Sequence, residues 1–402
     1  MNELQLNVAR ANAPCYLYDY EALKGQAEKL KEVFPAFDFL FSVKANPFPP
    51  VVKALASFGV GADAASAQEV LLAEECGMAC EDIYFSAAGK SDEALRKAWD
   101  HGHIIADSIG EVERIAAIAA QRGVTRRIGI RINPDFSVGG GAGHSSKFGI
   151  NEEDLPALGA FLKKAPVEVE GIHVHLKSQN LDAHVLGHYY ACCWALAKRV
   201  QAVLGCPMRY VNFGGGVGIA YDLRMEKPLD FAALRRYTDT IAAENEATLK
   251  ARLLIESGRF LTAQMGSYFL PVVDKKVSRG TTYVIVENCM NGLQKPAIAV
   301  MLRHAVGQGE LTPQEPMFTA EYAFPMTAYG DPKETEEVNI VGNLCCAQDV
   351  LAEHFVGPKL KVGDVIRVDN AGAYACTLTA FRFSSHIPPK ELLVDGAGKI
   401  VE

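Results

Sequence analysis

Lys44 is the residue whose position most needs a chemical explanation. It ends a run of strand-forming residues that begins at Phe41, and Asn46 and Pro47 follow it and end the strand. A lysine is rarely placed in an apolar strand unless something compensates its charge. A lysine amine with a lowered pKa can form a Schiff base with a carbonyl cofactor. The segment predicts either such a lysine or, more simply, a lysine that reaches solvent from a strand end.

Three consecutive glycines, Gly214 to Gly216, follow another β-branched run in "NFGGGVGI". Backbone N–H groups that are brought close together in this way favour a bound phosphate. The dinucleotide pattern GxGxxG with a later acidic residue is absent. The alternative interpretation is a tight turn.

"IESGRF", residues 255–260, ends a strand with Glu256 and places Arg259 three residues later. The carboxylate could hold a protonated ring nitrogen, and the guanidinium could face a phosphate. Taken alone, the motif is weak evidence for either role.

His173 and His175 lie two residues apart in "GIHVHLKSQN", so on a strand both would point to one face. Metal ligation is one interpretation of this spacing, but carboxylate or cysteine partners at useful spacing are missing, so we predict no metal site. We expect one imidazole to stack on an aromatic cofactor, whereas the other could be a core histidine with its hydrogen bonds satisfied. Cys345 in "GNLCCAQDV" could donate a proton if it reached this site, or it could be a small buried residue.

The elements that must position these residues alternate between short strands and amphipathic helices. The expected strands are 41–44, 61–65, 83–87, 104–107, 128–133, 171–176, 210–214 and 253–256. Eight strand–helix units predict a closed (β/α)8 barrel, in which functional residues gather where the strands end. A doubly wound sheet is the alternative, although it would not require eight strands.

After about residue 265 the pattern changes to period-two alternation punctuated by Gly and Pro, which predicts a mostly β domain. The opening "PCYLYDY" is also strand-like and could pair with that domain. We therefore expect a barrel over 26–265 and a discontinuous β domain over 1–25 and 266–402.

The chain has 402 residues and a net charge of -8, which argues against nucleic acid as a partner. We see no signal peptide and no apolar run long enough for a membrane span. The ten cysteines suggest neither a disulfide framework nor a zinc site. A cytoplasmic protein is the expected class.

In combination, these motifs resemble the fold type III pyridoxal-phosphate amino-acid decarboxylases, which include the diaminopimelate and ornithine decarboxylases. The resemblance extends over nearly the whole chain and implies a barrel plus a β domain. It implies that Lys44 in "SVKAN" holds pyridoxal 5'-phosphate as an imine, that His175 stacks on its ring and that Glu256 faces its ring nitrogen. The other positions that match the family's motifs around the cofactor are Asp63, Glu69, Ser178, Gly214, Gly215, Gly216, Gly258 and Arg259.

The resemblance also implies a homodimer with shared active sites. Cys345, followed by Asp349 in the same pattern, matches a cysteine supplied by the second subunit that protonates the carbon after carbon dioxide leaves. Tyr374 in "AGAYA" matches a tyrosine that reaches the cofactor and substrate across the dimer. Racemases of this fold usually pair the ring nitrogen with an arginine, so Glu256 favours decarboxylation.

Three positions depart from the diaminopimelate and ornithine decarboxylases, and all three concern the substrate. Cys346 stands where those enzymes carry an acidic residue for a distal ammonium, and a neutral thiol leaves such a charge unpaired. Lys177 replaces a glycine in the histidine motif, and Lys295 in "MNGLQKP" replaces an arginine. Both lysines are candidates to bind a polyanionic substrate, with solvated surface lysines as the alternative.

The subgroup that fits these changes contains the decarboxylases of carboxylate-siderophore pathways, such as the staphyloferrin B pathway, which act on an amino acid condensed with citrate. Four alternatives stay open: a decarboxylase of free diaminopimelate, ornithine or lysine, a decarboxylase of a carrier-tethered aminoacyl group, a racemase, and an inactive homologue that binds a partner enzyme. The presence of Lys44, His175, Glu256 and Cys345 argues against the last.

Overall fold

Two compact units make up the chain in the computed structural model, which describes residues 1–306 and 323–402. The barrel unit comprises Gln26–Ala220 and Lys227–Gly258, and the β unit comprises Met1–Gly25, Tyr221–Glu226 and Arg259–Glu402. Among the described helices, none combines the length and the apolar character that crossing a membrane needs.

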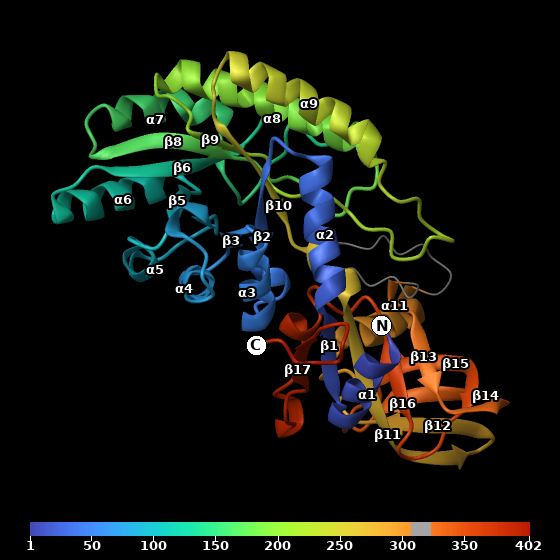
Figure 1. The fold of residues 1–402 in the computed structure, drawn as a ribbon. Helices are drawn as coiled ribbons and strands as arrows, with labels where there is room; N and C mark the ends of the chain where they lie inside the picture. The colour runs from blue at the N-terminus through green and yellow to red at the C-terminus, as the bar shows by residue number, and fades with distance from the viewer. Residues whose placement is uncertain (307–322) are drawn as a thin grey trace. The chain divides into compact units, whose positions relative to one another are not determined.

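Eight parallel strands of the barrel unit close into a ring (Figure 1). Their order is β5-β4-β3-β2-β10-β9-β8-β6, and β6 pairs back to β5. The predicted (β/α)8 barrel is therefore confirmed. The strands are β2 (Asp38–Ser42), β3 (Gly61–Ala64), β4 (Ile83–Phe85), β5 (His103–Ala106), β6 (Arg126–Asn133), β8 (Val167–His173), β9 (Tyr210–Asn212) and β10 (Arg252–Ser257), with the short β7 (Ile150–Asn151) beside β6.

Helices separate the barrel strands, and several begin at a side-chain cap. Ser66, Ser91 and Ser108 each accept a hydrogen bond from a backbone N–H in the first turn of the following helix. The helices are α2 (Tyr20–Val33), α3 (Pro49–Ser57), α4 (Ala67–Glu75), α5 (Asp92–Lys97), α6 (Ile109–Arg122), α7 (Leu155–Leu162), α8 (Ala183–Leu204) and α9 (Phe231–Ala247). The long helices α8 and α9 run side by side along the outside of β8 and β9 (Figure 1).

Aromatic and aliphatic side chains from different strands fill the barrel interior. The core cluster consists of Leu40, Tyr84, Ile105, Tyr210 and Leu254. Glycine is needed at Gly129 and Gly171, because a Cβ atom at either position would collide with the Tyr210 ring. This packing leaves the carboxyl ends of the strands to carry polar side chains.

The β unit is a mixed sheet, as its alternating sequence predicts. Strand β11 (Gly266–Ser278) pairs with β1 (Cys15–Asp19), β12 (Thr281–Val286) and β16 (Val365–Val368), and β1 also pairs with β17 (Lys390–Val394). The N-terminal strand thus belongs to the same sheet as the C-terminal strands. The remaining elements are α1 (Glu3–Asn12), α10 (Arg259–Thr262), α11 (Gln294–Val306), β13 (Met326–Tyr329), β14 (Asp331–Gly342) and β15 (Val350–Lys359).

Six of the eight expected barrel strands end one to three residues earlier than predicted, and two of these differences concern Lys44 and His175. Strand β2 ends at Ser42, and Lys44 lies in the 3-10 turn η1 (Val43–Ala45). Strand β8 ends at His173, so His175 lies in the loop beyond it. The prediction that both histidines share one strand face was therefore wrong, because strand alternation stops between them.

Candidate active site

The charge of Lys44 is compensated by a buried carboxylate at the end of the neighbouring strand. Lys44 Nζ donates to Asp63 Oδ2 over 2.9 Å, and the Ser86 hydroxyl donates to the other oxygen of Asp63. The Asp63 side chain is fully buried, whereas 45% of the Lys44 side chain is exposed. The amine is thus held at the carboxyl end of the barrel while one side stays accessible.

Glu69 shapes the turn that follows Asp63. Its carboxylate accepts a hydrogen bond of 2.6 Å from the backbone N–H of Ala65, while its own N–H donates to Ser66. Burial raises the pKa of Glu69, and the nearby Asp63 carboxylate adds to this effect. The side chain therefore acts here as a cap of α4 behind Asp63.

His175 is held in one tautomer by its neighbours. The backbone N–H of Gly215 donates to His175 Nδ1 over 3.0 Å, and the Ser178 hydroxyl lies 3.3 Å from Nε2. Because an N–H group can only donate, Nδ1 carries no proton and the ring is neutral with its proton on Nε2. Burial lowers the pKa of His175 to about 4, which agrees with a neutral ring.

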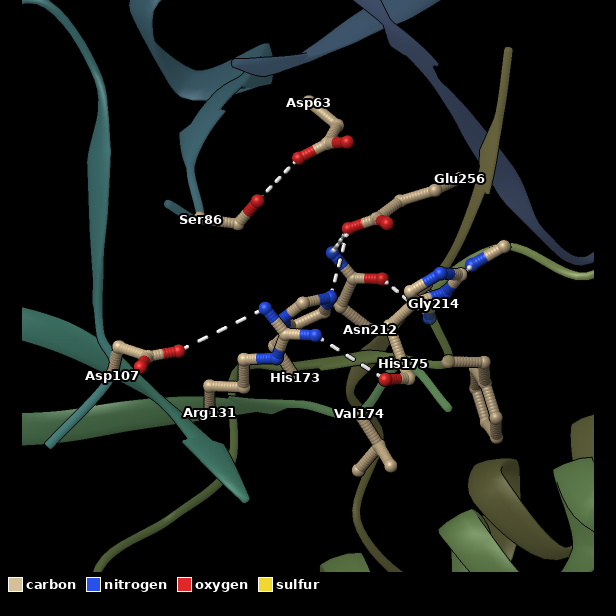
Figure 2. A network of polar contacts seen from close by, with 12 residues as sticks. Asp63, Ser86, Asp107, Arg131, His173, Val174, His175, Asn212, Gly214 and Glu256 are labelled. Carbon is tan, nitrogen blue, oxygen red and sulfur yellow. Dashed lines mark hydrogen bonds and ion pairs between the residues drawn. The ribbon is translucent and has the colours of Figure 1, made fainter. Parts of the chain in front are cut away.

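Glu256, the second-last residue of β10, is a buried carboxylate with two neighbours at one oxygen (Figure 2). Asn212 Nδ2 donates to Oε1 over 3.0 Å, and His173 Nε2 lies 3.0 Å from the same oxygen. Burial alone would raise the pKa of Glu256, but the interactions with His173, His175 and Lys44 hold that pKa well below its usual range. The group is therefore an anion in the barrel unit.

Arg131 and Asp107 connect two further strand ends to the histidine loop (Figure 2). Arg131 donates to the backbone oxygen of His175 over 3.2 Å, and its guanidinium lies 3.8 Å from Asp107. The Phe148 ring covers the guanidinium at 4.3 Å. These contacts position the loop that carries His175.

The glycine loop, Gly214 to Gly216, adopts a backbone conformation that side chains would prevent. Two of its N–H groups already donate hydrogen bonds within the chain. Gly214 and Gly216 have φ of +67° and +134°, and a Cβ atom on Gly214 would collide with the backbone oxygen of Val174. The N–H of Gly214 donates to Asn212 Oδ1 over 2.9 Å, and the N–H of Gly215 donates to His175. Phosphate binding by this loop stays a prediction.

In the β unit, two basic side chains lie against the ring of Tyr374. The guanidinium of Arg259 is 5.0 Å and Lys295 Nζ is 5.7 Å from the ring centroid. Arg259 also donates to the Tyr221 hydroxyl. Tyr374 therefore contacts Arg259 of its own chain, and its predicted role across a dimer stays a prediction.

Lys295 is buried, so it is not the solvated surface lysine that was the alternative interpretation. Only 1% of the residue is exposed, and Nζ has no hydrogen-bond partner among the described residues. Burial, with a smaller contribution from Arg259, holds the pKa of Lys295 well below its usual value. Lys177, in contrast, is exposed in the barrel unit.

The Cys345 turn is braced by Asp349. The two carboxylate oxygens of Asp349 accept hydrogen bonds from the N–H groups of Met290 and Leu344, over 2.8 and 2.9 Å. Cys345 is exposed, and its sulfur lies 3.6 Å from the Ser384 hydroxyl. Cys346 is partly buried.

Direct contacts thus join several, but not all, of the expected residues within each unit. In the barrel unit, Lys44 pairs with Asp63. Glu256 is linked to the glycine loop through Asn212, and His175 is linked to the same loop through Gly215. In the β unit, Arg259, Lys295 and Tyr374 lie together. Sequence reasoning missed the roles of Asn212 and Tyr221, although the position of Asn212 at a strand end, two residues before the first glycine of the loop, was an available signal.

A family model for the pyridoxal-binding domain of pyridoxal-dependent decarboxylases matches residues 21–263. The chain therefore belongs to the pyridoxal-dependent decarboxylases, and its cofactor is pyridoxal 5'-phosphate. This confirms the resemblance inferred from the motifs.

Individual relatives differ in the substrates that their names state. An L-glutamyl-[BtrI acyl-carrier protein] decarboxylase of Niallia circulans is 31% identical over 401 residues, which cover 97% of this chain and 91% of the relative. A 2-[(L-alanin-3-ylcarbamoyl)methyl]-2-hydroxybutanedioate decarboxylase of Staphylococcus aureus is 28% identical and covers 95% and 94%. The structure of Helicobacter pylori diaminopimelate decarboxylase complexed with L-lysine has a TM-score of 0.79 at 26% identity, covering 96% of this chain and 92% of that one.

The residues of the barrel unit fit this cofactor. A carbonyl group needs an amine, and Lys44 presents one at the barrel end. A carboxylate stabilises a protonated pyridine nitrogen, and Glu256 supplies one whose two neighbours both approach the same oxygen, Oε1. A planar ring needs an uncharged flat neighbour, which the neutral His175 supplies.

Proposed function

We propose that this pyridoxal-dependent decarboxylase removes the α-carboxylate from an amino acid that is already condensed with citrate, in carboxylate-siderophore biosynthesis. The observation that carries the proposal is Lys295. A buried amine without a hydrogen-bond partner in the described chain is costly, and a carboxylate-rich substrate would supply the missing acceptors. Arg259, which also lies against Tyr374, adds a second cation to the same group.

Cys346 supports the same proposal from the opposite direction. A free diamino acid would bring a distal ammonium, and a thiol cannot balance that charge. In a citrate conjugate the distal nitrogen is an amide or is absent. A neutral residue beside Cys345 therefore suits the conjugate better.

The relatives favour two substrate classes. The name of the Staphylococcus aureus relative describes an alanine joined through a carbamoyl group to a hydroxybutanedioate, which is a substrate of the proposed kind. The Niallia circulans relative acts on a glutamyl group on an acyl-carrier protein, and its 31% identity makes a carrier-tethered aminoacyl group the second candidate. Lys295 favours the first class, because the carboxylates of a citrate conjugate would supply the hydrogen-bond acceptors that its amine lacks in the described chain.

Bound pyridoxal phosphate supplies an electron sink for the carbon that loses carbon dioxide. We assign the chain's own roles as follows. Lys44 holds the cofactor covalently through its amine, and Asp63 orients that amine. Glu256 keeps a proton at the ring nitrogen, and His175 supports the ring as a neutral imidazole.

Cys345 is the proposed proton donor to the carbon that has lost its carboxylate. Its exposure leaves it accessible to another chain, and exposed apolar residues follow in the same unit, with Ile387 83% exposed and Phe383 46% exposed. We propose a homodimer in which Cys345 and Tyr374 serve the site of the partner subunit. Light scattering of the holoenzyme, together with complementation between Lys44→Ala and Cys345→Ala chains, tests this assembly.

Carbon dioxide release from the holoenzyme tests the substrate. The panel contains free diaminopimelate, ornithine and lysine, the citryl conjugates of ornithine, diaminopropionate and serine, and a glutamyl-loaded carrier protein. We expect release from a citryl conjugate. Release mainly from a free diamino acid or from the carrier would refute the proposal while leaving the decarboxylase assignment intact.

A matched pair of variants sharpens the assay. Cys346→Glu restores an acidic residue beside Cys345 and should raise activity on free diamino acids relative to citryl conjugates. Cys346→Gln introduces a side chain of the same size as glutamate but without the charge, so it should not raise this activity. Equal substrate ratios in both variants would remove Cys346 from the specificity argument.

A further inference from the structure

Three neighbouring strands place a carboxylate, an amide and an imidazole in one buried group. Glu256 lies on β10, Asn212 on β9 and His173 on β8, and at most 4% of any of them is exposed. Asn212 Nδ2 and His173 Nε2 both lie 3.0 Å from Glu256 Oε1 (Figure 2). Two groups from different strands thus approach the carboxylate at a single oxygen.

The orientation of Asn212 is determined by the backbone. Its side-chain oxygen accepts a hydrogen bond of 2.9 Å from the N–H of Gly214, so its NH2 group must face Glu256. The Asn212 side chain therefore couples the glycine loop to the carboxylate. It does not need His173 for this orientation.

His173 is constrained by the carboxylate instead. Nε2 faces an oxygen that can only accept, and Nδ1 is buried with no hydrogen-bond partner among the described residues. A proton on Nδ1 would have no acceptor there, so the proton belongs on Nε2. The Nε2–Oε1 distance suits a hydrogen bond, although the present orientation falls short of one.

We propose that His173 is a positioning residue for Glu256. Its N–H would anchor Oε1 from the side of β8 and leave Oε2 available to the ring nitrogen when pyridoxal phosphate is bound. A core histidine is the alternative interpretation of His173 from the sequence. The positioning role depends on the cofactor of the family rather than on the citrate substrate proposed above. Removal of the anchor lets the carboxylate rotate and weakens its hold on the cofactor.

A second histidine of the same barrel provides a matched control. His103 begins β5, and its Nδ1 lies 2.8 Å from Glu170 on β8. It is therefore also a histidine that contacts a carboxylate, but it belongs to the opposite, amino-terminal end of its strand. Identical substitutions at His173 and His103 distinguish a residue that positions Glu256 for the cofactor from one that only stabilises the barrel.

The variants are His173→Gln, His173→Asn, His103→Gln and His103→Asn. Glutamine can reach Glu256 with an N–H group, whereas asparagine is too short. The measurements are the thermal midpoint of the cofactor-free chain, the dissociation constant for pyridoxal phosphate and the absorption spectrum of the bound cofactor. We expect His173→Asn to bind the cofactor roughly tenfold more weakly, the size of one lost hydrogen bond to a charged group. Its spectrum should shift as well.

His173→Gln should restore both cofactor affinity and spectrum, and the His103 variants should change neither. The proposal is overturned if folded His173→Asn binds the cofactor with unchanged affinity and spectrum. It is also overturned if His103→Asn weakens binding equally. If both His173 variants fail to fold while both His103 variants fold, His173 is a structural residue and the positioning role is wrong.

Discussion

Replacement of Lys295 by methionine should stabilise the cofactor-free chain even though it removes a residue proposed to bind substrate. The residue is 1% exposed, and Nζ has no hydrogen-bond partner among the described residues. A buried polar group without a partner costs about 1–3 kcal/mol. Methionine has a similar length and no such group, so Lys295→Met should raise the free energy of unfolding by about that amount.

The pH dependence of this gain follows from the pKa of Lys295, which burial and Arg259 hold well below the ordinary value of 10.5. Between the lowered value and 10.5 the unfolded chain binds a proton that the native chain does not bind. The stability of the parent chain therefore rises with pH across that window. The advantage of Lys295→Met should therefore be fully present below the lowered pKa and should shrink as the pH rises from there toward 10.5.

Urea unfolding of the cofactor-free proteins at pH 7 and pH 10 measures both effects. Lys177→Met is the matched control, since Lys177 is exposed and its replacement should change stability by less than about 0.5 kcal/mol. Lower stability of Lys295→Met than of the parent would show that Lys295 has an anionic partner within the chain. An equal gain at both pH values would show that its charge is not the cause.

Three further predictions concern the site residues. Cys345→Ala should lower kcat for carbon dioxide release by at least about tenfold, as expected for a lost proton donor, whereas Cys346→Ala should lower it far less; steady-state kinetics on the active substrate compare the two. Because its folded pKa is depressed, Glu256 contributes stability above its ordinary value of 4.5 that is lost on acidification, so acid titration of unfolding should show a smaller loss for Glu256→Gln than for the parent. Asp63→Asn keeps a partner for Ser86 but removes the charge beside Lys44, the proposed Schiff-base lysine. It should therefore weaken pyridoxal phosphate binding measured by equilibrium dialysis, and unchanged affinity would contradict the proposed role.

The sequence was sufficient to predict the closed barrel and the mostly β unit, because eight strand signals and the later change to period two are local patterns. It also predicted that Lys44 and Glu256 lie near strand ends. The position of His175 was harder to predict, since the apolar run continues past His173 while the hydrogen-bonded strand stops there. The pairing partners of β8 decide that end, and they are far away in sequence.

The position of Asn212 at a strand end was visible in the sequence, but its hydrogen-bond partners were not, for a related reason. Its amide has one orientation only because the N–H of Gly214 occupies its oxygen, and it meets Glu256 only because β9 lies beside β10. Likewise, Lys295 is a residue of a type that usually lies at the surface, and it follows a glycine-containing turn in the sequence, so the sequence alone does not indicate burial. Only burial in the folded β unit distinguishes it from Lys177.

The charges of the site residues are balanced differently in the barrel unit and in the β unit. This difference indicates which residues determine the reaction type and which determine the substrate. In the barrel unit Lys44 has Asp63, Glu256 has Asn212 and His173, and His175 has both ring nitrogens engaged. Such a site is organised before substrate arrives, as a common cofactor reaction requires. In the β unit the amine of Lys295 lacks a hydrogen-bond acceptor in the described chain. A group with that deficit gains most from an anionic ligand, so changes in substrate preference among relatives should concentrate near Lys295 and Cys346, while Lys44, Asp63 and Glu256 tolerate little change.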